Sequence, residues 1–371
     1  MSDSALSSHS HNPTVFIDWP LFSRNSNGIL CLYELSLYLH RSGFAVYGVP
    51  RKIRAFLASV NTLPTRFRDI PFTAKPFGSS EDVFIAAETV PRRTMDAVRA
   101  QGIRVAWWCL APFCLLDGTQ WPRIGDLSLP YSSYVDPDSE RYYYFQPDPD
   151  ASFKRALAHQ KARPILARPR LCIYNGKGRF KKLTRRILDL CRESEIIMIT
   201  RASPSSRRKL FELLSSSDGL ITFDEFSALN LEAAALGLPV FLANPLFPER
   251  CRARFSIGKL QDYVVSDDEK FCELIAQRRQ NKLDPWDLSE LTSLNDATLD
   301  AWQSLLRVPF AFSDHVVTPD AASRFNDHTK MLTDKRIISV DNGGQAGGVW
   351  MSTFYISAIS KGRHYKAIMM A

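Results

Sequence analysis

Short runs of apolar residues alternate with longer amphipathic stretches along most of the chain, and each kind of pattern predicts its own element. Strands are predicted in the first half at residues 14–17, 44–49, 81–86 and 103–108. Strands are predicted in the second half at residues 171–174, 195–200, 219–223, 239–243 and 263–266. Helices are predicted between many of these strands, at residues 29–41, 94–101, 183–192, 206–214, 229–236 and 267–278. Such an alternation favours parallel sheets with helices on their faces.

The alternation is interrupted by a stretch rich in proline, which comprises Pro137, Pro147, Pro149, Pro164 and Pro169. Because proline breaks long elements, we place a connection between domains near residues 152–168. A chain of 371 residues is also longer than one hydrophobic core usually supports. The predicted fold class is therefore α/β, with two Rossmann-like doubly wound domains that face a cleft.

The domain boundaries follow from these breaks. We expect an N-terminal domain over residues 13–155 and a C-terminal domain over residues 165–290. Residues 1–12 are rich in serine and histidine and are expected to form a disordered leader. Residues 291–330 predict a helical segment, and whether it packs back on the N-terminal domain is left open. Residues 331–371 lack clear periodicity and receive no assigned role.

Composition and charge exclude some classes of protein and leave others. A hydrophobic fraction of 45% and a charged fraction of 23% are typical of a globular protein. No apolar stretch approaches the roughly 20 residues that span a bilayer. The seven cysteines are scattered and form no C-x-x-C pair, so buried thiols in the reducing cytoplasm are expected. The net charge of +8 fits an anionic partner, which leaves nucleotide phosphates, an anionic membrane face and nucleic acid.

The first candidate loop follows the predicted strand at residues 171–174. Its residues Gly176, Lys177, Gly178 and Arg179 combine two flexible backbone positions with two positive charges. Loops at the carboxyl ends of parallel strands bind ligands, and glycine lets a backbone approach a phosphate closely. The loop is therefore a candidate diphosphate cradle, and a solvated surface turn is the alternative.

The second candidate segment is the strand, loop and helix of residues 219–240. Asp224 lies in the loop, and Ser227 is placed to cap the helix that follows. That helix is apolar nearly all round, which predicts burial, yet it carries Glu232. Burying a carboxylate is costly unless it is paired or hydrogen-bonded. We interpret Glu232 as a ligand-binding acid, and a solvent-facing acid that suits the helix dipole is the alternative.

The run from Asp224 to Val240 resembles the E-x7-E region of retaining GT-B glycosyltransferases of the family 4-like group, commonly E-G-F-G-x-x-x-L-E-A-M-A-x-G-x-P-V. The resemblance rests on the phenylalanine, the second acid with the alanine after it, the glycine and the Pro-Val strand start. It implies that Glu232 binds the donor ribose and that Asp224 contacts the transferred sugar. The family's Lys-Gly pair, which binds the donor diphosphate, falls on Lys177 and Gly178.

The resemblance also implies a wider set of site residues, which supply the rest of the donor site and the acceptor side. They are Gly176, Arg179, Arg201, Phe226, Ser227, Ala228 and Leu229 for the donor, and Asn27 and Gly28 for the acceptor. The sequence departs from the pattern in three places, one of which is that the glycine-rich turn expected after the next strand reads Thr200-Arg-Ala-Ser-Pro204. Asp224 replaces a glutamate, and the arginine before the Lys-Gly pair is absent, so that Arg179 or Arg201 would substitute for it.

The function implied is transfer of a sugar, in the manner of a hexosyltransferase, from a nucleotide-sugar to a saccharide or lipid-linked acceptor. The resemblance further implies retention of configuration, no metal or other cofactor, and a role in polysaccharide or glycoconjugate assembly, with peripheral contact at the inner membrane face left open. The alternative is a catalytically inactive GT-B-like protein that binds nucleotide-sugars. Nucleic-acid binding rests on net charge alone and is not expected. The D-x-D pairs Asp136 and Asp138, and Asp148 and Asp150, are interpreted as turns rather than metal ligands.

Overall fold

The chain forms two compact units. The computed structural model describes residues 13–23, 26–111, 122–145, 147, 151–158, 166–176, 183–200, 203–245, 247, 260–285, 287–307 and 316–318, and every structural statement below concerns these residues. The first unit draws on Met1–Pro147 and Leu291–Ile338, and the second on Asp148–Glu290 and Ser339–Ala371.

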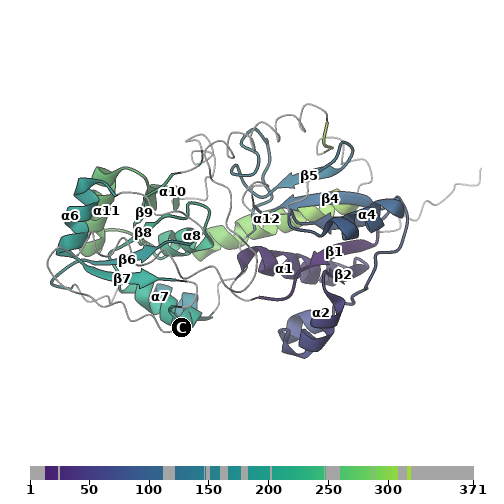
Figure 1. Cartoon of the computed structure of the whole chain (residues 1–371), viewed down its shortest axis with the longest axis horizontal. Helices are drawn as coiled ribbons and strands as arrows, with labels where there is room; N and C mark the ends of the chain where they lie inside the picture. The colour runs from purple at the N-terminus through teal and green to yellow at the C-terminus, as the bar shows by residue number, and fades with distance from the viewer. Residues whose placement is uncertain are drawn as a thin grey trace, which may run out of the picture. The chain divides into compact units, whose positions relative to one another are not determined.

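The first unit is built on a five-stranded parallel sheet in the order β2-β1-β3-β4-β5 (Figure 1). Its strands are β1 (Val15–Trp19), β2 (Val46–Pro50), β3 (Val83–Ala86), β4 (Arg104–Cys109) and β5 (Leu127–Pro130). The sequence pattern did not predict β5, because a short run that ends in proline indicates a turn. Its place at the edge of the sheet tolerates Pro130, since the outer side of β5 is paired near its start, through an isolated bridge between Leu127 and Val316, and not at Pro130 in the described residues.

Helices pack on this first sheet through specific polar and aromatic contacts. They are α1 (Asn27–Arg41), α2 (Ile53–Ser59), α3 (Thr65–Arg68), α4 (Arg92–Ala100) and α12 (Leu288–Arg307), with a 3-10 turn at Val60–Thr62. The indole N–H of Trp19 donates to Ser36 Oγ of α1 at 2.9 Å. Trp302 of α12 packs edge-on against Trp108 of β4, with ring centroids 5.6 Å apart. The helical segment whose packing the sequence left open thus lies on the first unit.

The second unit repeats this plan with the order β10-β9-β8-β6-β7, again with all strands parallel. Its strands are β6 (Arg170–Tyr174), β7 (Glu195–Ile199), β8 (Gly219–Thr222), β9 (Val240–Leu242) and β10 (Val264–Val265). Its helices are α5 (Ala151–Ala158), α6 (Arg185–Glu193), α7 (Arg207–Ser215), α8 (Ala228–Ala235), α10 (Leu260–Tyr263) and α11 (Asp268–Arg279). The strands and helices predicted for this half all form, with ends shifted by a residue or two.

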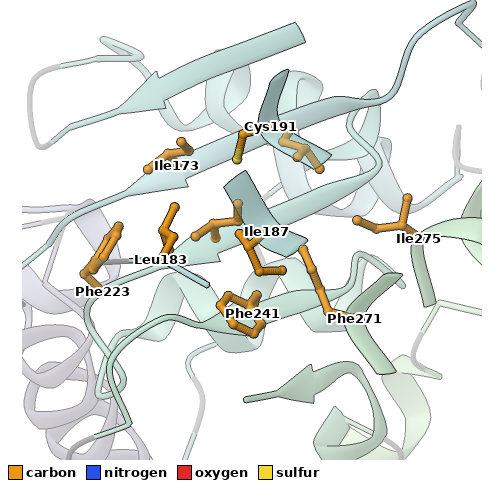
Figure 2. Close-up of a cluster of buried hydrophobic side chains, with 10 residues drawn as sticks. Ile173, Leu183, Ile187, Cys191, Phe223, Phe241, Phe271 and Ile275 are labelled. Atoms are coloured by element: carbon orange, nitrogen blue, oxygen red, sulfur yellow. The ribbon is translucent and has the colours of Figure 1, made fainter. Parts of the chain in front are cut away.

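Apolar side chains fix the layers of the second unit. Figure 2 shows Ile187 and Cys191 of α6 beside Phe271 and Ile275 of α11, all directed at the sheet. Alternate residues of the strands point to the opposite face, where Cys172 Sγ lies 3.2 Å from Ser217 Oγ, just after α7. Helices therefore cover both faces, as the doubly wound prediction requires.

Helix α5 lies in the stretch for which the prolines predicted a connection. It packs on α7, where Phe153 meets Phe211 edge-on with ring centroids 5.1 Å apart. The prolines do not prevent this helix, because Pro149 precedes it and Pro164 follows it.

Counted from the first strand of each unit, both sheets have the order 2-1-3-4-5. This is the second common doubly wound order, rather than the 3-2-1-4-5-6 order of dinucleotide-binding proteins, and it obeys the same rule for ligands. In each sheet the second strand lies on one side of the first strand and the third strand lies on its other side. This reversal creates a switch point between β1 and β3 in the first sheet and another between β6 and β8 in the second. No helix in the described part of the chain is both long and apolar enough to cross a membrane.

Candidate functional site

The two loops singled out in the sequence meet at the switch point of the second unit. Strands β6 and β8 are neighbours, and Tyr174 at the end of β6 pairs with Thr222 at the end of β8. Gly176 has a φ of +57°, and a Cβ placed on it would lie 2.6 Å from the Cβ of Asp224 and would also strike its Oδ2. No other residue type fits there without a shift, so the glycine is required both by its backbone and by the carboxylate beside it.

Local hydrogen bonds hold the loop after β8 in place. The N–H of Asp224 donates to Thr222 Oγ1 at 3.1 Å, and the side-chain amide of Asn230 donates to the carbonyls of Asp224 at 2.8 Å and Glu225 at 3.0 Å. The buried carboxylate of Glu225 accepts from the N–H of Phe247 at 3.0 Å, which ties the loop after β9 to the same place. The backbone around Asp224 is therefore fixed from several sides.

Helix α8 begins at this loop as predicted, with Ser227 as its cap. The hydroxyl of Ser227 accepts from the N–H of Leu229 at 3.3 Å. Ala228 opens the first turn, Leu229 is buried, and half-buried Phe226 packs against Phe247 with ring centroids 6.4 Å apart. The amide end of a buried helix thus lies beside Asp224, which is an arrangement that favours negatively charged ligands.

Glu232 has a partner that the sequence did not suggest. Its Oε1 lies 2.6 Å from Nη2 of Arg207, and its side chain is 12% exposed. Arg207 is the first residue of α7 and stacks over the ring of Phe211, 4.8 Å from its centroid. Basic residues after a serine cap normally indicate a solvated helix start, so the pattern gave no signal for this contact. The pair explains how an apolar helix tolerates an acid.

Four of the predicted donor residues lie outside the described residues, namely Lys177, Gly178, Arg179 and Arg201. Of the predicted donor set, the structure describes Gly176, Asp224, Glu232 and the run Phe226–Leu229. Gly176 and Asp224 are in direct proximity, and Glu232 follows one turn further along the helix that starts beside Asp224.

Within the part of the chain that the structure describes, three asparagine side chains at this end of the second sheet have buried oxygens with no hydrogen-bond partner. They are Asn175 Oδ1, directly after β6, Asn230 Oδ1, on the helix after β8, and Asn244 Oδ1, just after β9. Leaving a buried acceptor unpaired costs about 1–3 kcal/mol for each group. Sequence reasoning missed these residues, because asparagine near a strand end usually indicates a turn.

The predicted acceptor residues lie in the first unit, at the start of α1. Asn27 is the first residue of that helix, and its side chain hydrogen-bonds to Tyr131, which directly follows β5. A Cβ at Gly28 would lie 3.5 Å from Cδ1 of Leu110, which is ordinary van der Waals contact. Both residues therefore lie at the carboxyl edge of the first sheet.

The switch point of the first unit is filled by charged groups that satisfy one another. Arg51, directly after β2, donates from Nε and Nη2 to the carboxylate of Asp18 at 2.5–3.2 Å, and from Nη2 to Thr89 Oγ1 at 2.8 Å. Asp18 is fully buried, and this burial raises its pKa while Arg51 opposes the shift. Buried Glu88 accepts from the N–H of Leu110 at 3.0 Å, and its pKa is also raised by burial.

Among the described residues, no three side chains of His, Cys, Asp or Glu gather as a potential metal site. The carboxylate of Asp136 accepts the N–H of Asp138 at 3.0 Å, which is the turn expected for this D-x-D pair. Asp148 and Asp150 lie outside the described residues.

Comparisons with known proteins give fold-level matches only. No protein-family model and no curated protein matches the chain. Among solved structures it is similar to spinosyn rhamnosyltransferase SpnG in complex with spinosyn aglycone, at 14% identity and a TM-score of 0.35, over 78% of this chain and 96% of that one. It is similar to the glycosyltransferase SnogD from Streptomyces nogalater at 12% identity and a TM-score of 0.36, over 79% of this chain and 100% of that one.

A third match is a protein described as a UDP-N-acetylglucosamine 2-epimerase from Listeria monocytogenes, at 10% identity and a TM-score of 0.37, over 88% of this chain and 98% of that one. These matches assign no function to the chain. The assignment of function therefore rests on the residues of the site.

Proposed function

We propose that the chain is a glycosyltransferase that binds a nucleotide-sugar at the carboxyl edge of the second sheet and transfers its sugar to a saccharide or lipid-linked acceptor. The observation that supports this most directly is the approach of Gly176 to Asp224 across the β6–β8 switch point. Two segments almost fifty residues apart in the sequence, which were assigned to the diphosphate and to the sugar, are thereby neighbours. Switch points are where open α/β sheets bind nucleotides.

The diphosphate is assigned to the loop that begins at Gly176 and continues with Lys177 and Gly178. Lys177 supplies positive charge, and the amide end of α8 adds a favourable dipole. Such groups stabilise the charge that develops on the departing diphosphate, and this electrostatic stabilisation usually contributes more to catalysis than any other single effect. Asp224, one methylene shorter than the family's glutamate, is assigned to the transferred sugar.

Glu232 is assigned to the ribose, with Arg207 as its positioning residue. The contact with Arg207 at Oε1 fixes the direction of the carboxylate, to which a ribose hydroxyl would donate a hydrogen bond. In this proposal Arg207, which pattern reasoning overlooked, is as important for donor binding as the acid itself.

The acceptor is assigned to the first unit, at Asn27 and Gly28 beside the start of α1. We propose transfer with retention of configuration, of a hexosyl type and without a metal, on the strength of the E-x7-E resemblance. The described cysteines are all free thiols, which supports a reducing compartment, so we place the protein in the cytoplasm with contact at the inner membrane face. Sedimentation with vesicles that contain anionic lipid tests the membrane contact.

The first experiment is a thermal-shift screen of UDP, GDP, ADP and dTDP with their sugar conjugates, because a ligand that binds only the folded chain raises its melting temperature. Lys177→Ala should weaken binding of the diphosphate and of its sugar conjugate alike. Lys270→Ala, at an exposed ion pair with Glu273 on α11, is the matched control and should bind as the wild type does.

Absence of any shift across the whole screen would contradict the proposed function. Equal binding by the Lys177 variant and its control would remove only the diphosphate assignment. Binding without sugar release or transfer, across a broad set of acceptors, would identify a nucleotide-sugar binding protein that lacks catalysis.

A further inference from the structure

The three unpaired asparagine oxygens belong to residues just after β6, just after β9 and on the helix that follows β8, and we call these residues the asparagine row. Asn175 follows Tyr174 of β6, and Asn244 follows Ala243, whose N–H donates to Thr222 of β8 at 2.9 Å. The side chain of Asn230 is anchored on the loop after β8, which lies between them. Neighbouring strands are about 4.8 Å apart, so the two ends of the row are separated by roughly 10 Å. A single water molecule does not span that distance.

The orientation of the central amide is fixed by its own contacts. Nδ2 of Asn230 donates to two carbonyls, of Asp224 and Glu225, which leaves Oδ1 as the atom without a partner. Asn230 and Asn244 are each only 3% exposed, so neither is a solvated surface amide. Asn230 therefore holds a buried acceptor in a fixed orientation, and Asn244 carries another that is as deeply buried.

Acceptor oxygens select the chemistry of what they bind. A phosphate oxygen is itself an acceptor and gains nothing from an amide oxygen, whereas a hydroxyl donates. The carboxylate of Asp224 adds another acceptor beside the row, next to Gly176. The asparagine row is thus suited to hydroxyl donors, whereas the diphosphate stays assigned to the Gly176 loop and the amide end of α8.

We infer that Asn175, Asn230 and Asn244 are specificity-determining residues that accept hydrogen bonds from the hydroxyls of the transferred sugar. This inference rests on the proposed function and names the class of donor, a fully hydroxylated hexose. A site built to pair a hydroxyl rejects an analogue that lacks it, because the protein acceptor then stays buried and unpaired. Deoxy sugars attached to the same nucleotide are therefore discriminated against.

The test separates a ligand role from a structural one by measuring stability and affinity in the same variants. Asn244→Leu removes an unpaired acceptor, so the melting temperature of the free chain should stay the same or rise. The ligands are UDP-glucose, GDP-glucose, ADP-glucose and dTDP-glucose, and the one used is the conjugate of the nucleotide that binds the wild type. In this variant, affinity for that conjugate should fall by about tenfold or more relative to affinity for the free nucleoside diphosphate. Asn175→Ala should give the same pattern.

Two variants and one kind of ligand serve as controls. Asn230→Leu also loses two donated hydrogen bonds and should lower the melting temperature, unlike Asn244→Leu. Asn295→Leu changes a buried asparagine of α12 that has an interaction partner, and it should destabilise the chain without changing the ratio of the two affinities. Conjugates of singly deoxygenated glucose are the ligand controls, since the wild type should bind at least one of them about as weakly as Asn244→Leu binds the glucose conjugate.

Each outcome bears on a different statement. If none of the nucleoside diphosphates binds the wild type, the proposed function fails and this inference fails with it. If they bind but the gain from the attached sugar is the same in Asn244→Leu and Asn175→Ala as in the wild type, the inference is overturned while the nucleotide site stands. A lowered melting temperature with unchanged affinities would show that the oxygens are paired by internal water and have a structural role.

Discussion

The two units share one strand order, yet their switch points are occupied in opposite ways. In the first unit, Arg51 and Asp18 form a bidentate ion pair directly at the switch point. In the second, the corresponding place has Gly176 against Asp224 and the unpaired amide oxygen of Asn175. Topology alone therefore creates a potential ligand site in each sheet, and the side chains decide which one is filled by the protein itself.

The difference can be traced to single positions in the sequence. The residue after β2 is Arg51, whereas the residue after β7, the equivalent strand of the second sheet, is Thr200. The described residues of the first unit also have unpaired buried hydroxyls, at Ser128 and Ser132, but these belong to β5 and its end, away from the switch point. The first unit closes its switch point with charge, and the second leaves acceptors there.

The largest expected effect comes from opening the first switch point. Arg51→Met leaves the fully buried carboxylate of Asp18 without its partner, and it should lower the free energy of unfolding by about 3–5 kcal/mol in urea titrations. Arg192→Met breaks an exposed pair with Asp189 and should cost less than about 1 kcal/mol. Equal losses in the two variants would show that the Asp18 pair does not close the first unit.

Crowding the second switch point should have the next largest effect. Gly176→Ala and Gly102→Ala both place a side chain at a positive φ, of +57° and +72°, but only the first meets Asp224, whereas nothing lies within 4 Å of the second. Overpacking costs about 1–3 kcal/mol, so Gly176→Ala should be less stable than Gly102→Ala by that amount. The measurement is thermal unfolding, and equal stability would mean that Gly176 does not approach Asp224.

Neutralising the acid of the second site should weaken donor binding more than it weakens the fold. Glu232→Gln keeps the shape of the side chain but loses the charged contact to Arg207 and to a ribose, so affinity for nucleotide-sugar should fall at least about tenfold. Glu212→Gln alters an exposed pair with Arg208 on α7 and should change neither affinity nor melting temperature. Full activity in the Glu232 variant would remove this residue from the site.

The smallest effect is a change in the pH dependence of stability. Because burial raises the pKa of Glu88, the folded chain binds a proton that the unfolded chain has released, and stability falls as pH rises from about 4.5 towards the raised pKa. Glu88→Gln should flatten that part of the curve, while Asp18, whose pKa is also raised, keeps the remaining slope. Urea titrations over this range measure it, and identical slopes would contradict the shift.

Much of the fold was predictable because local patterns and tertiary packing agree. The cap at Ser227, the apolar helix α8 and the Pro239-Val240 strand start all form as the pattern indicates. Strand β5 was missed, since its proline argues against a strand unless the strand lies at an edge, and edge position is a property of the whole sheet. Helix α5 was missed because the flanking prolines dominated a short apolar pattern.

The sequence by itself determined the alternation of elements, the two candidate loops and the odd position of Glu232, because these depend on neighbours within a few turns of chain. Only the tertiary structure decided that Arg207 pairs with Glu232 and that Gly176 approaches Asp224. It also decided that the second sheet has unpaired amide oxygens near its switch point, whereas an ion pair occupies the switch point of the first sheet. Those contacts join residues about 25 to 50 positions apart, and their partners are set by strand order, which no local pattern encodes.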